Sequence, residues 1–195
     1  MPGEKYVVEE GVADFQDKGK GALLVLDSHV LSAETRELYT TIRASLYIRG
    51  SGGFGYKGKV KSNFPAIPKR APDFVQEEPT RKNQAFLYRL LRDKNPLHVD
   101  PKMSAKGGFQ TPILHGLCQF GFSARVIQEN YCPLDPQGFE QMNARFISPV
   151  FPGDTLIVQC WKDGNNIIFA TKTKERGKVV IMGYVTLKKP QAAKL

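Results

Sequence analysis

The order of apolar and polar positions in the first 50 residues predicts antiparallel β structure. Apolar residues alternate loosely over 5–15, and two apolar segments follow at 22–31 and 38–50. The glycine-containing stretch DKGKG and the polar stretch SAETRE separate these segments and are typical of turns. The pattern predicts a meander of three strands that ends at GSGGFG, residues 50–55.

A long helix is predicted in the second half of the chain. Apolar residues occupy nearly every side of the segment 113–127, so we expect other structure to enclose this helix on most sides. Thr111 is suited to the N-cap and Pro112 to the first helical position. The polar residues of the helix follow one narrow line, at His115, Gln119 and Ser123.

Three strands are predicted after this helix, at 155–161, 166–174 and 178–187. A long enclosed helix wrapped by an antiparallel meander is the hot-dog fold, which belongs to the α+β class. The second meander has the same organisation as the first, which indicates a duplicated architecture. The predicted fold is therefore one complete C-terminal hot-dog and a partial N-terminal hot-dog repeat that lacks the helix.

The segment 56–80 has no clear periodicity and contains prolines at 65, 68, 72 and 79. We interpret it as a linker that lies over the surface. After it, Thr80 is placed to cap a short helix over 81–93. The predicted domains are a partial repeat at 1–55, the linker at 56–80, a hot-dog domain at 81–190 and a C-terminal tail at 191–195.

Composition and charge narrow the classes of protein. The chain of 195 residues is 41% hydrophobic and can bury a core, and it contains no apolar run long enough for a membrane span. The net charge of +9 is spread along the chain without aromatic platforms, which favours a polyphosphate ligand or a merely solvating surface over nucleic acid. Cys118, Cys132 and Cys160 have no metal-like spacing and are expected to be reduced thiols of an intracellular protein.

A first candidate site lies in the stretch RDKNPLH, which places Asp93, Asn95 and His98 within six positions. On a continuous helix, Asp93 and His98 would point about 140° apart. Pro96 prevents such a helix and pushes Asn95 into an extended conformation, so the chain must turn there. The turn can bring an acid/base pair to one side, or the polar residues can simply end a helix. The composition of the stretch leaves both interpretations open.

A second candidate feature is the start of the long helix, in TPILHGLC. The amides of Leu114, His115 and Gly116 would be free in the first turn and could bind a carbonyl oxygen or an oxyanion. Gly116 either lets a ligand approach the backbone or serves helix packing, and His115 either belongs to the site or braces it. Neither a serine elbow nor a metal-ligand spacing is found, so no metal is expected. The glycines of 50–55 lack the strand-to-helix context of a dinucleotide-binding loop.

Together, the stretches YRLLRDKNPLHVDP and GFQTPILHGLCQFGFSARV resemble the signature of the hydratase-2 (MaoC-like) enoyl-CoA hydratases. The likeness extends to ADFQDKGKGALLVLDSHV, GSGGFG and ARFISPVFPGDTL, and so covers most of the chain. Within the family, it is greatest to the hydratase portions of the peroxisomal multifunctional enzymes. The resemblance implies an enzyme, a hydro-lyase that adds water to trans-2-enoyl-CoA to give (3R)-3-hydroxyacyl-CoA in peroxisomal fatty-acid β-oxidation.

This resemblance also implies roles for the candidate residues. Asp93 and His98 would hold and activate the water, and Asn95 would position them. The amide of Gly116 would polarise the thioester carbonyl. No metal or redox cofactor is implied, because the thioester itself acidifies the α-carbon. The residues implied in substrate binding are Lys18, Pro96, Leu97 and Phe146.

Two departures from the family's pattern are visible. The family usually has Ser-Gly before the aspartate, whereas this chain has Leu91 and Arg92, so the departure concerns the local backbone shape. Eukaryotic members carry two hot-dog repeats, and here the first repeat lacks its central helix. Two other functions therefore stay open: a non-catalytic acyl-CoA-binding or assembly subunit, and a hot-dog thioesterase.

Partners and location are expected from the resemblance and from the C-terminal residues. The substrate implied is an acyl-CoA thioester. A homodimer is expected, because an incomplete repeat leaves exposed strand edges. The tail Ala193-Lys194-Leu195 resembles the small-basic-leucine address that a peroxisomal import receptor reads, so the expected location is the peroxisome.

Overall fold

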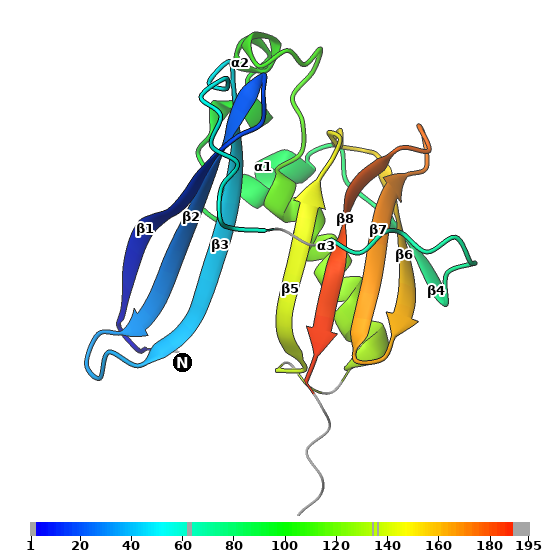
Figure 1. The fold of residues 1–195 in the computed structure, drawn as a ribbon. Helices are drawn as coiled ribbons and strands as arrows, with labels where there is room; N and C mark the ends of the chain where they lie inside the picture. The colour runs from blue at the N-terminus through cyan, green and yellow to red at the C-terminus, as the bar shows by residue number, and fades with distance from the viewer. Residues whose placement is uncertain (1–2, 62–63, 134, 136, 189–195) are drawn as a thin grey trace, which may run out of the picture. The chain divides into compact units, whose positions relative to one another are not determined.

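A computed structural model describes residues 3–61, 64–133, 135 and 137–188 (Figure 1). The chain divides into two compact units, Met1–Asn63 and Phe64–Leu195. Among the described residues, no helix combines the length and the apolar character needed to cross a membrane. The predicted targeting tail, residues 193–195, lies outside the described residues.

The first unit is an antiparallel meander of three strands in the order β1-β2-β3, which confirms the strands predicted there. Its strands are β1 (Tyr6–Asp17), β2 (Gly21–Ser32) and β3 (Leu38–Arg49). Residues 3–61 contain no helix, and β3 is exposed along its whole length. A sheet of three strands with one uncovered strand buries little apolar surface by itself.

A carboxylate binds the GSGGFG loop to the end of β1. Asp17 accepts hydrogen bonds from the amides of Gly19 at 2.7 Å, Gly53 at 3.0 Å and Gly55. These bonds lower the pKa of the Asp17 carboxyl to about 2, from an ordinary value of 3.8, because they stabilise its ionised form. The loop therefore presents two of its amides to the protein's own carboxylate.

The second unit is a five-stranded antiparallel sheet in the order β4-β6-β7-β8-β5, with a long helix along one face (Figure 1). The strands are β4 (Phe74–Pro79), β5 (Phe139–Phe146), β6 (Thr155–Asp163), β7 (Asn166–Thr173) and β8 (Val179–Leu187). The long helix is α3 (Gly116–Tyr131), preceded by α1 (Gln84–Arg89), the 3₁₀ turn η1 (Pro96–His98) and α2 (Pro101–Lys106). The predicted hot-dog arrangement of the α+β class is confirmed, and the predicted strands after the helix correspond to β6, β7 and β8.

The core of the second unit lies between α3 and the sheet. Ile127 of α3 and Phe169 of β7 belong to the same buried apolar cluster. Ile168, the neighbour of Phe169, belongs to a smaller cluster on the other face, with Trp161 and Ile67. Both faces of β7 are therefore buried, because successive side chains of a strand point to opposite faces. Each such large apolar side chain contributes about 1.5–3 kcal/mol when it is fully buried.

The interpretation of 56–80 as a surface linker is wrong for residues 74–79, which form β4 and pair with β6. Residues before β4 are also attached to the sheet, since Trp161 Nε1 donates to the Arg70 carbonyl at 3.0 Å and Ile67 packs on Trp161. β4 and β5 were not predicted, because both are edge strands in which polar residues and a proline obscure the alternation.

The short helix α1 begins at Gln84, and the predicted capping role of Thr80 is wrong. The Thr80 hydroxyl donates to the Asp154 carbonyl at 2.7 Å and accepts from the Gly153 amide at 2.9 Å. Thr80 thereby connects the end of β4 to the turn before β6. This contact joins residues more than 70 positions apart, so no local pattern could indicate it.

The long helix begins at Gly116, so the predicted start at Pro112 with Thr111 as its cap is wrong. The Leu114 amide donates to the Val150 carbonyl at 2.7 Å, which holds the preceding segment outside the helix. His115 occupies the N-cap with an extended ψ of 135°. The sequence predicted a free amide at Leu114, and this prediction is wrong.

The polar line of α3 points into the protein. His115, Gln119 and Ser123 are at most 3% exposed, and the Ser123 hydroxyl bonds the Thr171 hydroxyl at 2.8 Å. The helix is enclosed on most sides, as expected, but it has one exposed line. That line is formed by Leu117, Gly121, Arg125 and Glu129.

We predict that Asp17→Asn destabilises the first unit at neutral pH by several degrees in the melting temperature, since an amide binds the loop amides less strongly than a carboxylate does. Because the pKa of the folded carboxyl is about 2 and its ordinary value is 3.8, the stabilisation is complete above pH 3.8 and is lost as the pH falls towards 2. Urea unfolding followed by circular dichroism across that range measures the effect.

The matched control is Glu34→Gln, which changes an exposed carboxylate of the same unit. Asp14, whose pKa is also lowered to about 2, keeps titrating in both variants. The difference between wild type and Asp17→Asn should therefore shrink in acid. A difference that is the same at neutral pH and near pH 2 would contradict the role of the Asp17 charge.

Candidate active site

A left-handed residue after α1 places Asp93. Arg92 has φ 75°, and its amide donates to the Arg89 carbonyl at 3.0 Å. Glycine usually occupies such a position at a helix end, because a side chain there costs roughly 1–2 kcal/mol. The departure from Ser-Gly to Leu91 and Arg92 therefore keeps the left-handed turn with a residue that is strained in it.

Asn95 connects the aspartate to the histidine. Its amide donates to Asp93 Oδ1 at 3.0 Å, and its side-chain oxygen accepts from the Leu97 amide at 3.0 Å. Its ψ of 119° is the extended conformation expected before Pro96, which starts η1. The predicted turn between Asp93 and His98 is confirmed, and Asn95 makes the hydrogen bonds that hold it.

A backbone carbonyl and a second ring fix the orientation of His98. Its Nδ1 lies 2.9 Å from the carbonyl oxygen of Ile113, so Nδ1 carries the hydrogen and Nε2 is available to the site. The His98 ring stacks on the His115 ring, with centroids 3.8 Å apart and planes inclined by 28°. His98 is buried, at 9% exposure, so its position is well defined.

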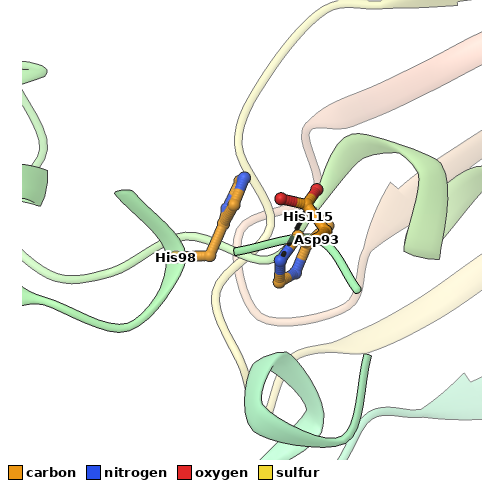
Figure 2. Close-up of side chains that lie close together, drawn as sticks. All are labelled: Asp93, His98 and His115. Atoms are coloured by element: carbon orange, nitrogen blue, oxygen red, sulfur yellow. Dashed lines mark ion pairs between the residues drawn. The ribbon is translucent and has the colours of Figure 1, made fainter. Parts of the chain in front are cut away.

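Asp93, His98 and His115 lie close together (Figure 2). One ligand atom of each side chain lies within 4.8 Å of the others, and His115 Nε2 is 3.9 Å from Asp93 Oδ2. The side chains come from the loop after α1, from η1 and from the N-cap of α3. The structure therefore brings together Asp93 and His98, and it adds His115 to them.

His115 is a neutral, buried imidazole. Burial lowers its pKa, the neighbouring His98 and Arg89 lower it further, and Asp93 has the opposite effect. Among the described residues, neither ring nitrogen of His115 has a hydrogen-bond partner. The ring is enclosed by His98 on one side and by Tyr88, whose ring centroid is 4.7 Å away.

Tyr88 and Arg89 border this cluster and were missed as site residues in the sequence. Arg89 Nη1 is buried and has no hydrogen-bond partner in the described part of the chain. Both residues belong to the short helix α1, and no spacing distinguishes them from its other members. The packing of α1 against the start of α3 brings them next to His115.

The cluster contains two imidazoles and a carboxylate, and these groups are also common ligands of zinc. The Arg89 guanidinium is close enough to lower the pKa of His115. A positive charge beside the donors opposes the binding of a cation, so the charge of the surroundings favours acid/base chemistry over zinc binding.

Gly116 presents a free amide at the start of α3. No acceptor among the described residues takes a hydrogen bond from this amide. A Cβ on Gly116 would lie 3.2 Å from Cε1 of Phe146, so the glycine also allows this ring to pack on the helix start. Both interpretations of Gly116, close packing and an available amide, are compatible with this geometry.

The residues expected to bind substrate come from different parts of the chain. Phe146 borders Gly116, and Leu97 follows Pro96 in η1. Lys18 belongs to the first unit, where its amide donates to the Gly21 carbonyl in the turn between β1 and β2. Contact of these four side chains with a substrate stays a prediction.

A groove of about 220 Å³ lies next to the cluster. Its lining residues are Tyr88, Leu117, Cys118, Gly121, Phe122 and Arg125. It follows the exposed line of α3 and is mostly apolar. A larger hollow of about 500 Å³, which includes Arg70 and Lys162, lies at the other end of α3 beside Tyr131.

A hot-dog fold with an Asp–His cluster at the start of its central helix defines the class of this protein. Residues 63–183 match the MaoC like domain. The chain therefore belongs to the MaoC-like family, which confirms the resemblance of the motifs around Asp93 and Gly116.

Curated relatives share this family and extend beyond the chain. It is 46% identical to peroxisomal multifunctional enzyme type 2 of Mus musculus, over 92% of this chain and 24% of the relative. It is 42% identical to enoyl-CoA hydratase 2, peroxisomal, of Arabidopsis thaliana, over 96% of this chain and 64% of the relative. The chain thus spans less than two thirds of either protein.

Two solved structures have the same fold over nearly the whole chain. The full-length peroxisomal multifunctional enzyme type 2 of Drosophila melanogaster is 41% identical, with a TM-score of 0.85 over 94% of this chain and 34% of that one. A MaoC-like dehydratase from Phytophthora capsici is 35% identical, with a TM-score of 0.87 over 97% of this chain and 66% of that one.

We predict that Arg92→Gly raises the free energy of unfolding by about 0.5–1 kcal/mol. Glycine relieves the strain at φ 75°, and part of that gain is offset by its greater freedom in the unfolded chain. Chemical denaturation measures the change.

Arg81→Gly is the matched control, because Arg81 is also exposed but does not have a positive φ. The Arg81→Gly variant should be less stable than the wild type. Equal losses in both variants would contradict the argument.

Proposed function

We propose that this protein is an (R)-specific 2-enoyl-CoA hydratase, which adds water to trans-2-enoyl-CoA to give (3R)-3-hydroxyacyl-CoA. The observation that carries the proposal is the convergence of Asp93 and His98 near the free amide of Gly116. The similarity to proteins named enoyl-CoA hydratase 2 and peroxisomal multifunctional enzyme type 2 supports this substrate class and a role in peroxisomal β-oxidation.

The proposed reaction uses the cluster as an acid/base pair. A water molecule held by Asp93 and His98 attacks C3 of the conjugated thioester. One of the two groups takes a proton from the water and the other gives a proton to C2, so the elements of water are added. The Gly116 amide, at the positive end of α3, stabilises the negative charge that develops on the thioester oxygen. The proposal therefore involves no metal and no cofactor.

The apolar groove beside the cluster supports an acyl substrate. It begins at Tyr88, whose ring lies against His115, and continues along α3 past Leu117 and Phe122. Ligand sites are typically apolar clefts with a few polar groups at the reacting end. A hydrocarbon chain in this groove would place its thioester end near the acid/base cluster.

The two alternative functions give different products. A non-catalytic acyl-CoA-binding or assembly subunit would bind the thioester without any loss of the enoyl ultraviolet absorbance. A thioesterase would release free thiol. The hydratase is favoured because a binding subunit has no need for an oriented Asp–His pair in which His98 is fixed by the Ile113 carbonyl.

Location and assembly form part of the same proposal. The curated relatives named above are described as peroxisomal, and the tail 193–195 fits a peroxisomal import address. A homodimer is supported by the uncovered strand β3, whose exposed apolar side chains include Ile42 and Leu46.

Removal of residues 193–195 from a fluorescently labelled chain is expected to abolish its import into peroxisomes, because the receptor reads the free C-terminal address. Fluorescence overlap with a peroxisomal matrix marker measures this. Ala193→Ser is the control, since it produces the Ser-Lys-Leu address and should keep import. Import that persists after removal would show that another signal directs the protein.

Asp93→Asn and His98→Gln are each expected to lower kcat by about 10²- to 10⁴-fold, because each removes one member of the acid/base pair. The assay follows the loss of enoyl absorbance of a trans-2-enoyl-CoA, and chiral analysis of the product tests the (3R) configuration. Circular dichroism checks that both variants are folded.

Asp163→Asn and His29→Gln are the matched controls. Asp163 is an exposed carboxylate at the end of β6, and His29 is a half-buried histidine of β2 that contacts Thr41. Both controls should keep wild-type turnover. Undiminished turnover in Asp93→Asn and in His98→Gln would exclude the proposed site, and a wild-type protein that binds enoyl-CoA but never hydrates it would exclude the function.

A further inference from the structure

His115 is a buried polar group that the proposed reaction leaves without a role. The residue is 1% exposed, and neither ring nitrogen has a hydrogen-bond partner among the described residues. Buried polar side chains in native proteins are nearly always hydrogen-bonded, because an unpaired one loses its bonds to water without replacement. An imidazole left unpaired beside two acid/base groups therefore requires an explanation.

The acceptor that faces this imidazole is Asp93. Its Oδ2 lies 3.9 Å from His115 Nε2, which is beyond the roughly 2.7–3.2 Å range of a hydrogen bond. Nε2 is buried and has no contact with bulk solvent. The Asp93 side chain is 41% exposed, and in the described part of the chain only its Oδ1 accepts a hydrogen bond, from the Asn95 amide. A small rotation about this anchored oxygen brings Oδ2 within reach of Nε2.

The ring of His115 is held more firmly than the carboxylate. It lies between the rings of His98, at 3.8 Å, and Tyr88, at 4.7 Å. Burial keeps the imidazole neutral, so one ring nitrogen carries a hydrogen and can donate it. The carboxylate is therefore the partner that moves, and the fixed imidazole determines where it stops.

We propose that His115 is the positioning residue of Asp93: its Nε2–H donates a hydrogen bond to Oδ2 in the substrate complex. With the Asn95 amide on Oδ1, this second bond fixes the plane of the carboxylate with respect to the water. Catalytic hydrogen bonds are often long in the free protein and shorten in the complex. The kinetic consequences rest on the proposed hydratase function, whereas the hydrogen bond itself does not.

Two substitutions separate this role from simple packing. His115→Gln keeps an N–H donor close to the position of Nε2 and loses the ring. His115→Phe keeps the ring and its stacking on His98 and loses the donor. The proposal predicts that Phe lowers kcat by about 10- to 100-fold, with KM within about twofold, and that Gln retains more turnover than Phe. A packing role predicts the reverse order.

Thermal melting accompanies the kinetics. His115→Phe should melt at the wild-type temperature or above it, because it replaces an unpaired polar group by an apolar one. A variant that loses kcat while it keeps its stability is not explained by damage to the fold. His29→Gln, which changes a half-buried histidine of the first unit, controls for the loss of a histidine as such.

The outcomes distinguish this inference from the proposed function. If the wild-type protein hydrates enoyl-CoA and His115→Phe is as active as His115→Gln or more so, the positioning role is excluded and the hydratase function stands. If the wild-type protein does not hydrate enoyl-CoA, the function is excluded. A crystal structure of the protein soaked with acyl-CoA then tests whether the hydrogen bond from His115 to Asp93 forms. An Nε2–Oδ2 distance of about 2.7–3.2 Å supports it, and an unchanged distance overturns it.

Discussion

The site of the second unit depends on one backbone hydrogen bond, from the Leu114 amide to the Val150 carbonyl at 2.7 Å. Because this bond holds the residues before α3 outside the helix, the helix starts only at Gly116, whose amide is left free. The same non-helical segment directs the Ile113 carbonyl to Nδ1 of His98 at 2.9 Å. A single contact with the chain before β6 is thus associated with both the free amide of Gly116 and the orientation of the His98 ring.

The backbone before Asp93 shows how strongly local shape constrains this site. Arg92 adopts a left-handed conformation that its side chain disfavours, and the structure keeps it because the amide of Arg92 closes the last turn after α1. Asn95 then binds both Asp93 and the start of η1. Among the described residues, the carboxylate is consequently held by a hydrogen bond at one oxygen and by none at the other.

Part of this arrangement could be predicted from sequence, and the failures have a common cause. Strands β6 to β8 alternate or are continuously apolar, so they were recognised, whereas the edge strands β4 and β5 are polar and were missed. The sequence showed a narrow polar line on α3 but not which way it points, and Ser123 of this line is buried, where it pairs with Thr171 of β7. Periodicity indicates that a face differs from the others, and the partner across the interface decides which way that face points.

The sequence by itself determined the hot-dog class, the MaoC-like family and the turn between Asp93 and His98. These features depend on periodicity, on motif spacing and on the effect of Pro96 on its immediate neighbour, all of which act over a few residues. Only the tertiary structure decided where α3 begins and that His115 is buried against the ring of His98. Those outcomes depend on hydrogen bonds and ring contacts between residues far apart along the chain, and such contacts leave no local pattern.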